Sequence, residues 1–338
     1  MNGRPLGRTG LQVSEMGLGC WALGGNSYGT VRDENSLEAL ETAWDAGVNF
    51  FDTADVYGEG HSEVLIGKFL EGKPREKVFI ATKAGWDFYP VGSGAFGREK
   101  EPAGRMLRAA HRKNFDPLYL RFACERSLER LSTGTIDLYQ LHNPSLEQIR
   151  AGAAVGVLEV LKKEGKIRFI GISVHTEAEA LAALEDPRVD ALQVIYNLLD
   201  QRMRKRVFPE ALRRGVGILA REPLASGLLS EKYPPEHHFP KNDHRRRWTA
   251  EKRTLDWEKI RKLKAVLKGG TVSLRQAALE YVLNYKEVSA VIPGAKTAVQ
   301  VTENLKASVA PLMSPEAFAA IQNLYETEPA FGQGLVPR

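Results

Sequence analysis

The stretch FFDTADVYGEGHSE, residues 50–63, contains one complete unit of the expected fold. An apolar run ends at Asp52, a turn that carries Tyr57 follows, and a helical pattern begins near residue 61. Apolar runs that are almost continuous are typical of parallel strands buried on both faces of a sheet. The stretch therefore predicts a buried strand whose carboxyl end delivers polar side chains to a loop.

The same order of strand, polar end and helix recurs along the chain. Apolar runs predict strands at 16–19, 48–52, 78–82, 136–141, 168–173, 190–196, 216–220 and 288–292. Helical patterns predict helices at 61–70, 119–131, 155–164, 177–185, 206–214 and 273–285. Asn35 with Glu38 resembles a capping box that starts an earlier helix, which Gly47 ends. This alternation predicts an α/β fold, a (β/α)₈ TIM barrel. A doubly wound two-domain protein is the alternative, but no Pro/Gly/Ser-rich linker divides the chain.

Three further segments extend the expected barrel. The turn signals Gly7 and Gly10 predict an N-terminal β-hairpin before the first barrel strand. Residues 84–117 and 223–256 are too long for simple strand-to-helix loops, so we expect them to be lids over the C-terminal face, where barrels place active sites. Residues 1–334 are then one barrel domain, and 335–338 are interpreted as an expression-tag remnant.

Composition excludes several classes of protein. A net charge of +5 over 338 residues is mild, whereas nucleic-acid binders usually have a denser basic face. The only cysteines, Cys20 and Cys124, form neither a CxxC motif nor a Cys/His cluster, so we expect no disulfide framework and no metal site. No secretory segment and no run of about 18 apolar residues occurs, which predicts a cytoplasmic protein without membrane contact. The sequence carries no signal of oligomeric state.

Polar residues at three strand ends suggest an enzyme. Asp52 and Tyr57 follow one apolar run, Lys83 ends VFIATK, and His142 ends IDLYQLH. A phenol has a pKa of about 10, and a neighbouring ammonium lowers it, so Lys83 held by Asp52 would make Tyr57 a better proton donor. His142 would orient a carbonyl oxygen toward it. Taken singly, each residue has a structural interpretation as a cap, core aromatic, solvated lysine or buried histidine, but their co-occurrence favours carbonyl protonation coupled to hydride transfer.

The motifs DTADVYG, IATKAG and LYQLHNP resemble the catalytic signatures of the aldo-keto reductases. The resemblance runs from the hairpin to about residue 304 and implies a (β/α)₈ barrel with nicotinamide-dependent carbonyl reduction. It also implies that Tyr57 is the general acid, that Lys83 and Asp52 tune it, and that His142 orients the substrate.

Several segments are candidates for binding NADP(H). GLGCWA at 17–22 matches a Rossmann glycine motif, but a loop rather than a helix follows, so we reject that interpretation. In the barrel, Gly19 and Cys20 would lie near the nicotinamide, and Trp21 would be a pocket wall or a core residue. By resemblance, Ser173 and Gln193 hold the nicotinamide carboxamide. Val174 stands where the family usually has Asn, so Asn197 or water is a possible substitute.

The phosphates and adenosine have their own candidates, again by resemblance. AREPLASGLLSEKY at 220–233 is similar to a pyrophosphate-binding loop, in which the ligands would be Pro223, Leu224, Ser226 and Gly227. Arg221 takes the place of an aromatic residue that stacks on the nicotinamide in many relatives, and we hypothesise that it favours NADPH over NADP⁺. IPGAKTAVQVTEN at 292–304 resembles the adenosine-phosphate motif, which assigns Lys296, Thr297, Gln300, Glu303 and Asn304.

The function predicted is NADPH-dependent reduction of small aldehydes or ketones. Basic residues of the lids, including Arg245, Arg246 and Arg247, are most simply solvated charge, with attraction of NADPH or acidic substrates as the alternative. Two other functions stay open. The protein would act as an aldose or alcohol dehydrogenase if it runs oxidatively, or as a cofactor-sensing regulatory subunit resembling potassium-channel β subunits.

Overall fold

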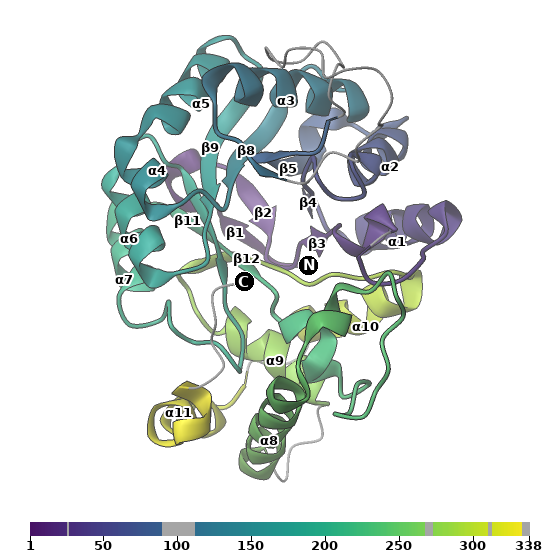
Figure 1. Ribbon diagram of the computed structural model, residues 1–338, viewed down its shortest axis with the longest axis vertical. Helices are drawn as coiled ribbons and strands as arrows, with labels where there is room; N and C mark the ends of the chain where they lie inside the picture. The colour runs from purple at the N-terminus through teal and green to yellow at the C-terminus, as the bar shows by residue number, and fades with distance from the viewer. Residues whose placement is uncertain (26, 90–111, 268–272, 310–312, 333–338) are drawn as a thin grey trace, which may run out of the picture.

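The computed structural model describes residues 1–25, 27–89, 112–267, 273–309 and 313–332 (Figure 1). Its strands are β1 (Gly3–Pro5), β2 (Gln12–Ser14), β3 (Leu18–Gly19), β4 (Phe50–Asp52), β5 (Phe79–Ala84), β6 (Trp86–Asp87), β7 (Arg112–Lys113), β8 (Ile136–His142), β9 (Ile167–Ser173), β10 (Ala191–Ile195), β11 (Gly217–Arg221) and β12 (Val288–Ile292). Its α-helices are α1 (Asp33–Asp45), α2 (His61–Leu70), α3 (Pro117–Arg130), α4 (Leu146–Ala151), α5 (Ala153–Lys163), α6 (Glu177–Glu185), α7 (Val207–Arg214), α8 (Ala250–Val266), α9 (Leu274–Leu283), α10 (Ala298–Val309) and α11 (Pro315–Thr327).

The central sheet is a nearly closed parallel barrel. Eight strands pair in the order β3-β4-β5-β8-β9-β10-β11-β12. Parallel bridges from Met16 to Val291 and from Gly19 to Gly294 join its two edges, and the Gly17 amide donates to the Val291 carbonyl at 2.8 Å. These contacts confirm the predicted barrel and rule out the doubly wound sheet, which keeps two open edges.

Two apolar cores hold the barrel together. Most buried residues lie between the strands and the surrounding helices. A smaller cluster fills the barrel interior with side chains that include Phe50, Leu138 and Leu219, and it also contains Leu6 and Val13 of the N-terminal hairpin. The antiparallel pairing of β1 with β2 confirms that hairpin. Because its side chains close the amino-terminal end of the barrel, the cavity opens at the carboxyl ends of the strands.

Predicted strands and helices agree with the structure to within a few residues, but some details differ. The proposed capping box of Asn35 and Glu38 is wrong: α1 begins at Asp33 without a side-chain cap, and Asn35 accepts a hydrogen bond from Arg32 instead. The excursion expected at 223–256 includes the start of α8, and the one at 84–117 includes the hairpin β6–β7. Local turn chemistry therefore misplaced one helix start without affecting the barrel.

Two expectations fall on residues that the structure does not describe. The middle of the first excursion, 90–111, and the interpreted tag remnant at 335–338 lie outside the described residues. Among the described helices, none is both long and apolar enough to cross a membrane.

Candidate active site

Four side chains meet at the carboxyl end of the barrel. Asp52 ends β4, Lys83 lies near the end of β5, His142 ends β8, and Tyr57 lies in the turn after β4. The Lys83 ammonium donates to Asp52 Oδ2 at 2.7 Å and to the Thr53 carbonyl at 2.6 Å. It lies 5.0 Å from the centre of the Tyr57 ring, and the His142 ring lies 5.8 Å from that ring, edge to face. The structure thus brings together all four residues that the motifs indicated.

A buried amide network holds the Asp52 carboxylate. Gln193 Nε2 donates to Asp52 Oδ1 at 2.7 Å, and Gln140 Nε2 approaches the same oxygen at 3.3 Å. Both glutamines are fully buried, as is Lys83 on the other carboxylate oxygen. Gln140 stands within the motif LYQLHNP but the sequence indicated no role for it, although it lies two residues before His142 and so on the same face of β8. Each oxygen of Asp52 has a donor, and the ion pair is consequently fixed in one geometry.

The electrostatics around Tyr57 differ from the sequence expectation. Desolvation raises the pKa of its hydroxyl and the charge of Asp52 adds to the rise, while Arg221 is the main cation that opposes them. Lys83 is not among the leading influences on this pKa, so the net shift is upward and the lowered pKa expected from the sequence is wrong. Burial also lowers the pKa of Lys83, and burial together with Lys83 holds the pKa of His142 well below its ordinary value. At neutral pH the site has a neutral phenol beside a neutral imidazole.

One cavity of about 980 Å³ extends from these residues along the barrel rim. Tyr57, His142 and Trp86 line its inner end, and Ser226 and Lys296 line its outer part. Cavities for drug-sized ligands are about 300–1,000 Å³. The volume therefore accommodates an elongated ligand together with a small substrate.

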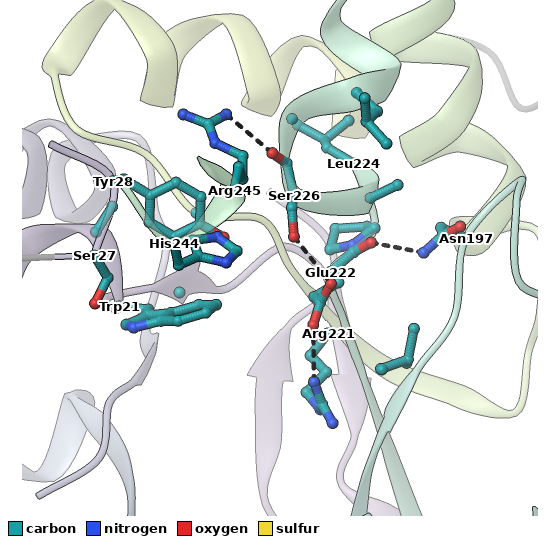
Figure 2. A pocket seen from close by; sticks show the side chains of 18 of the residues that line it. Trp21, Ser27, Tyr28, Asn197, Arg221, Glu222, Leu224, Ser226, His244 and Arg245 are labelled. Atoms are coloured by element: carbon teal, nitrogen blue, oxygen red, sulfur yellow. Dashed lines mark hydrogen bonds and ion pairs between the residues drawn. The ribbon is translucent and has the colours of Figure 1, made fainter. Parts of the chain in front are cut away.

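The aromatic rings of Trp21, Tyr28 and His244 lie together on the wall of the cavity (Figure 2). The His244 ring lies 4.7 Å from that of Trp21 and 4.6 Å from that of Tyr28, and Trp21 stacks at 24° on Tyr57 with centres 5.8 Å apart. The backbone of His244 donates to the Ser27 carbonyl at 2.8 Å, which ties the two loops together. Trp21 is therefore a cavity wall rather than a core residue.

The basic run at 245–247 in the second lid is not simply solvated charge, because its first residue, Arg245, is buried. Its guanidinium is buried and makes two bonds to Asp243, at 2.9 and 2.6 Å, and one to the Ser226 carbonyl at 3.1 Å. The ring of Tyr233 lies 4.2 Å away, and that of Phe239 at 4.5 Å. Only the two arginines that follow are exposed, as expected. Arg245 joins the lid to the proposed phosphate loop.

Ser173 and Gln193, the expected ligands of the nicotinamide carboxamide, lie level with each other on neighbouring strands. Ser173 pairs in register with His142 on one side and with Gln193 on the other. Gln193 Oε1 is buried and has no hydrogen-bond partner among the described residues. Val174 packs in the apolar core. Asn197, suggested as a replacement for the Asn that position 174 lacks, makes other hydrogen bonds. Its amide donates to the Glu222 carbonyl at 2.9 Å, and its side-chain oxygen accepts two backbone bonds.

Arg221 lies at the end of β11 and is held on three sides. Its guanidinium donates to the Glu222 carboxylate at 3.0 Å (Figure 2). It also donates to the Val174 carbonyl at 3.2 Å and lies 3.1 Å from His175 Nδ1. These bonds give the planar cation a single orientation on the cavity wall. Burial, followed by the charge of Arg221, lowers the pKa of His175 to about 4.

The segment after Arg221 differs partly from the expected phosphate loop. Ala225, Ser226 and Gly227 have left-handed φ angles of 49°, 54° and 92°. The Gly227 amide donates to the Leu224 carbonyl at 2.9 Å, and the Ser226 hydroxyl donates to Glu222 at 3.1 Å. Neither donor is oriented as expected for a phosphate. Pro223 also lines the cavity but has no N–H, so its contribution is limited to shape.

The adenosine candidates divide into two groups. Lys296, Gln300 and Asn304 line the cavity, and the Lys296 ammonium donates to the Tyr28 carbonyl. Thr297 caps the helix by accepting from the Gln300 amide at 3.3 Å, and Glu303 pairs with Arg275 at 3.2 Å and with Lys306, so neither is in the cavity wall.

Of the two candidates near the end of the first barrel strand, only one lines the cavity. Gly19 lines the cavity, whereas the Cys20 thiol is fully buried against the Leu18 carbonyl and burial raises its pKa. The Cys20 backbone instead donates to the Asp52 carbonyl at 2.8 Å and so braces the end of β4. No group of three or more potential metal ligands occurs within the described ranges.

Comparisons with known proteins show what this chain is similar to. A sequence model of the aldo/keto reductase family matches residues 15–326. A D-threo-aldose 1-dehydrogenase from a Pseudomonas species is 30% identical over 307 residues, which cover 87% of this chain and 89% of that protein. An aldo-keto reductase from Bacillus halodurans, in its holo form, is 29% identical with a TM-score of 0.76 over 96% of both chains. A glycerol dehydrogenase from Gluconobacter oxydans is 29% identical with a TM-score of 0.77 over 97% of this chain and 96% of its own.

Proposed function

The chain belongs to the aldo/keto reductase family, and we propose that it reduces small aldehydes or ketones to alcohols with NADPH. One observation carries the proposal. Tyr57 and His142 line the inner end of a cavity, and the buried Lys83–Asp52 ion pair lies against the Tyr57 ring. That arrangement offers a proton donor and an orienting imidazole to a carbonyl group in a partly desolvated space.

The residues of the chain then have distinct roles. NADPH, when bound, supplies the hydride. Tyr57 donates its proton to the carbonyl oxygen, and its raised pKa keeps it protonated throughout the neutral range. His142 stays neutral and orients that oxygen by hydrogen bonding. Lys83, fixed by Asp52, holds a positive charge beneath the Tyr57 ring, where it stabilises the phenolate that proton transfer creates.

A phosphorylated nicotinamide cofactor suits the outer part of the cavity. Lys296 and Arg275 line it, as does Lys232 near the end of the proposed phosphate loop. A charge-assisted hydrogen bond contributes about 1.5–3 kcal/mol, which selects NADPH over NADH by about one or two decades in affinity. The unpaired Gln193 Oε1 at the inner end matches a ligand that donates an N–H. We also propose that the protein works in the cytoplasm, where its two free cysteines stay reduced.

The test is NADPH consumption with a panel of aldehydes, comparing the wild type with Tyr57→Phe. Loss of the general acid should lower the rate by roughly 10²–10⁴ while NADPH binding persists. The substitution removes only one hydroxyl, so binding measured by fluorescence serves as the control for folding. Undiminished turnover by Tyr57→Phe would exclude Tyr57 as the acid.

A second candidate is oxidation of a polyol or aldose by the same residues in reverse. Two similar proteins, the D-threo-aldose 1-dehydrogenase and the glycerol dehydrogenase, carry names of this kind. Faster NADP⁺ reduction with glycerol or aldoses than NADPH oxidation with their carbonyl counterparts would favour it. Tight NADPH binding without turnover in either direction would instead favour a cofactor-sensing regulatory subunit.

A further inference from the structure

Asn143, directly after His142, is held in a backbone conformation that few residues adopt. Its φ angle is 58°, in the left-handed region, where Asn is one of the better tolerated residues. Its amide donates to the Ser173 carbonyl at 3.0 Å, its side-chain Oδ1 accepts from the Ser173 hydroxyl at 3.1 Å, and its carbonyl accepts from the Lys113 ammonium. Three independent contacts therefore specify where this side chain lies.

The other polar atom of the Asn143 side chain, Nδ2, is a hydrogen-bond donor. Asn143 Nδ2 has no hydrogen-bond partner in the part of the chain that the structure describes, and Asn143 lines the cavity. Gln193 lines the same wall, and its amide orientation is set because Nε2 donates to Asp52, which leaves Oε1 as an unpaired acceptor. A donor and an acceptor thus lie on either side of Ser173, which is level with both His142 and Gln193.

A primary amide is the group that matches such a pair, because its oxygen accepts and its NH₂ donates. We propose that Asn143 and Gln193 together hold the nicotinamide carboxamide, with Asn143 Nδ2 donating to its oxygen and Gln193 Oε1 accepting from its nitrogen. Asn143 thereby supplies the donor that buried Val174 lacks. Lys113 of the β6–β7 hairpin is a positioning residue that fixes the left-handed turn. This inference rests on the proposed nicotinamide cofactor.

The test compares two ligands that share everything except the nicotinamide. Dissociation constants of NADPH and of 2′-phospho-ADP-ribose, which ends at the ribose, are measured by calorimetry. Asn143→Asp keeps the shape and tolerates the left-handed turn but removes both N–H donors, and Asn143→Gly removes the side chain while permitting the same φ. Either variant should lower the affinity for NADPH about tenfold, equivalent to about 1.4 kcal/mol, and change the affinity for 2′-phospho-ADP-ribose by no more than about twofold.

Two controls make the outcome specific. Asn323→Asp, an exposed change of the same chemistry on α11, should leave both affinities unchanged. Lys113→Met should lower the affinity for NADPH but not that for 2′-phospho-ADP-ribose. The loss should be smaller than in Asn143→Asp, because the change loosens the turn without removing the donor. Unchanged NADPH affinity in the Asn143 variants, or an equal loss for both ligands, would overturn the role of Asn143. A wild type that binds neither ligand would overturn the proposed cofactor itself, and this inference with it, so the two failures are distinguishable.

Discussion

The floor and the roof of the cavity are built in different ways. The floor is the buried layer at and beneath the inner end of the cavity. It comprises Asp52, Lys83, Gln140 and Gln193, which come from four barrel strands and meet through buried side-chain hydrogen bonds. The roof comprises Trp21, Tyr28 and His244, which come from loops and meet through ring contacts and backbone bonds. Floor positions follow from strand register, whereas roof positions follow from loops docking on each other. We therefore expect floor substitutions to cost stability and chemistry, and roof substitutions to change ligand exchange.

The largest effect should come from removing the floor's cation. Lys83→Met leaves the buried Asp52 carboxylate without its counter-ion, and unpairing a buried ion costs about 3–5 kcal/mol. Urea unfolding should show that loss. Lys163→Met, which breaks an exposed pair with Glu159, is the matched control and should change stability by less than about 1 kcal/mol. Equal effects of the two changes would show that the floor is no more rigid than the surface.

Acid should destabilise the inner cavity through its histidines. Burial lowers the pKa of His175 to about 4, below the ordinary value of about 6.5 expected in the unfolded chain. Between those values the unfolded chain binds a proton that the folded chain does not, so stability falls as the pH falls from about 6.5 to 4, by roughly 1–3 kcal/mol for this residue. His175→Gln should flatten the dependence of urea midpoints on pH, whereas His238→Gln, an exposed change, should not.

A roof substitution should act on ligand exchange. His244→Ala removes the ring contacts to Trp21, Tyr28 and Trp248 that hold the roof together, so NADPH should dissociate roughly tenfold faster in stopped-flow measurements. Arg246→Ala, an exposed neighbour on the same short helix, is the control. An unaltered dissociation rate would show that the roof does not restrain the cofactor.

The smallest expected effect concerns the wall between floor and roof. Arg221 is a fixed planar cation, less favourable beside the cationic ring of NADP⁺ than beside neutral NADPH. Arg221→Trp should therefore reduce the preference for NADPH by a few-fold, measured as the ratio of the two dissociation constants. An equal ratio of the two dissociation constants in the wild type and in Arg221→Trp would contradict the hypothesis that Arg221 favours NADPH.

The strand-end residues of the site were predictable, and the roof was not. Asp52, Lys83 and His142 end apolar runs, and parallel strands place such ends side by side, so their proximity follows from the sequence pattern. Arg245 shows the opposite case. The two residues that follow it in the chain are exposed arginines, and only docking against Asp243, Tyr233 and Phe239 buries Arg245. No local pattern distinguishes it from the two residues that follow.

Periodicity and strand-end chemistry by themselves predicted the barrel and the meeting of Asp52, Lys83 and His142 at its carboxyl end, because these depend on which face of a strand a side chain occupies. The tertiary structure alone decided that Cys20 faces the core, that Gln140 completes the floor, and that Trp21 stacks on Tyr57. It also decided the direction of the Tyr57 pKa shift. Those features depend on distances between segments far apart in the chain and on the water excluded between them, and neither quantity is encoded in any local stretch of residues.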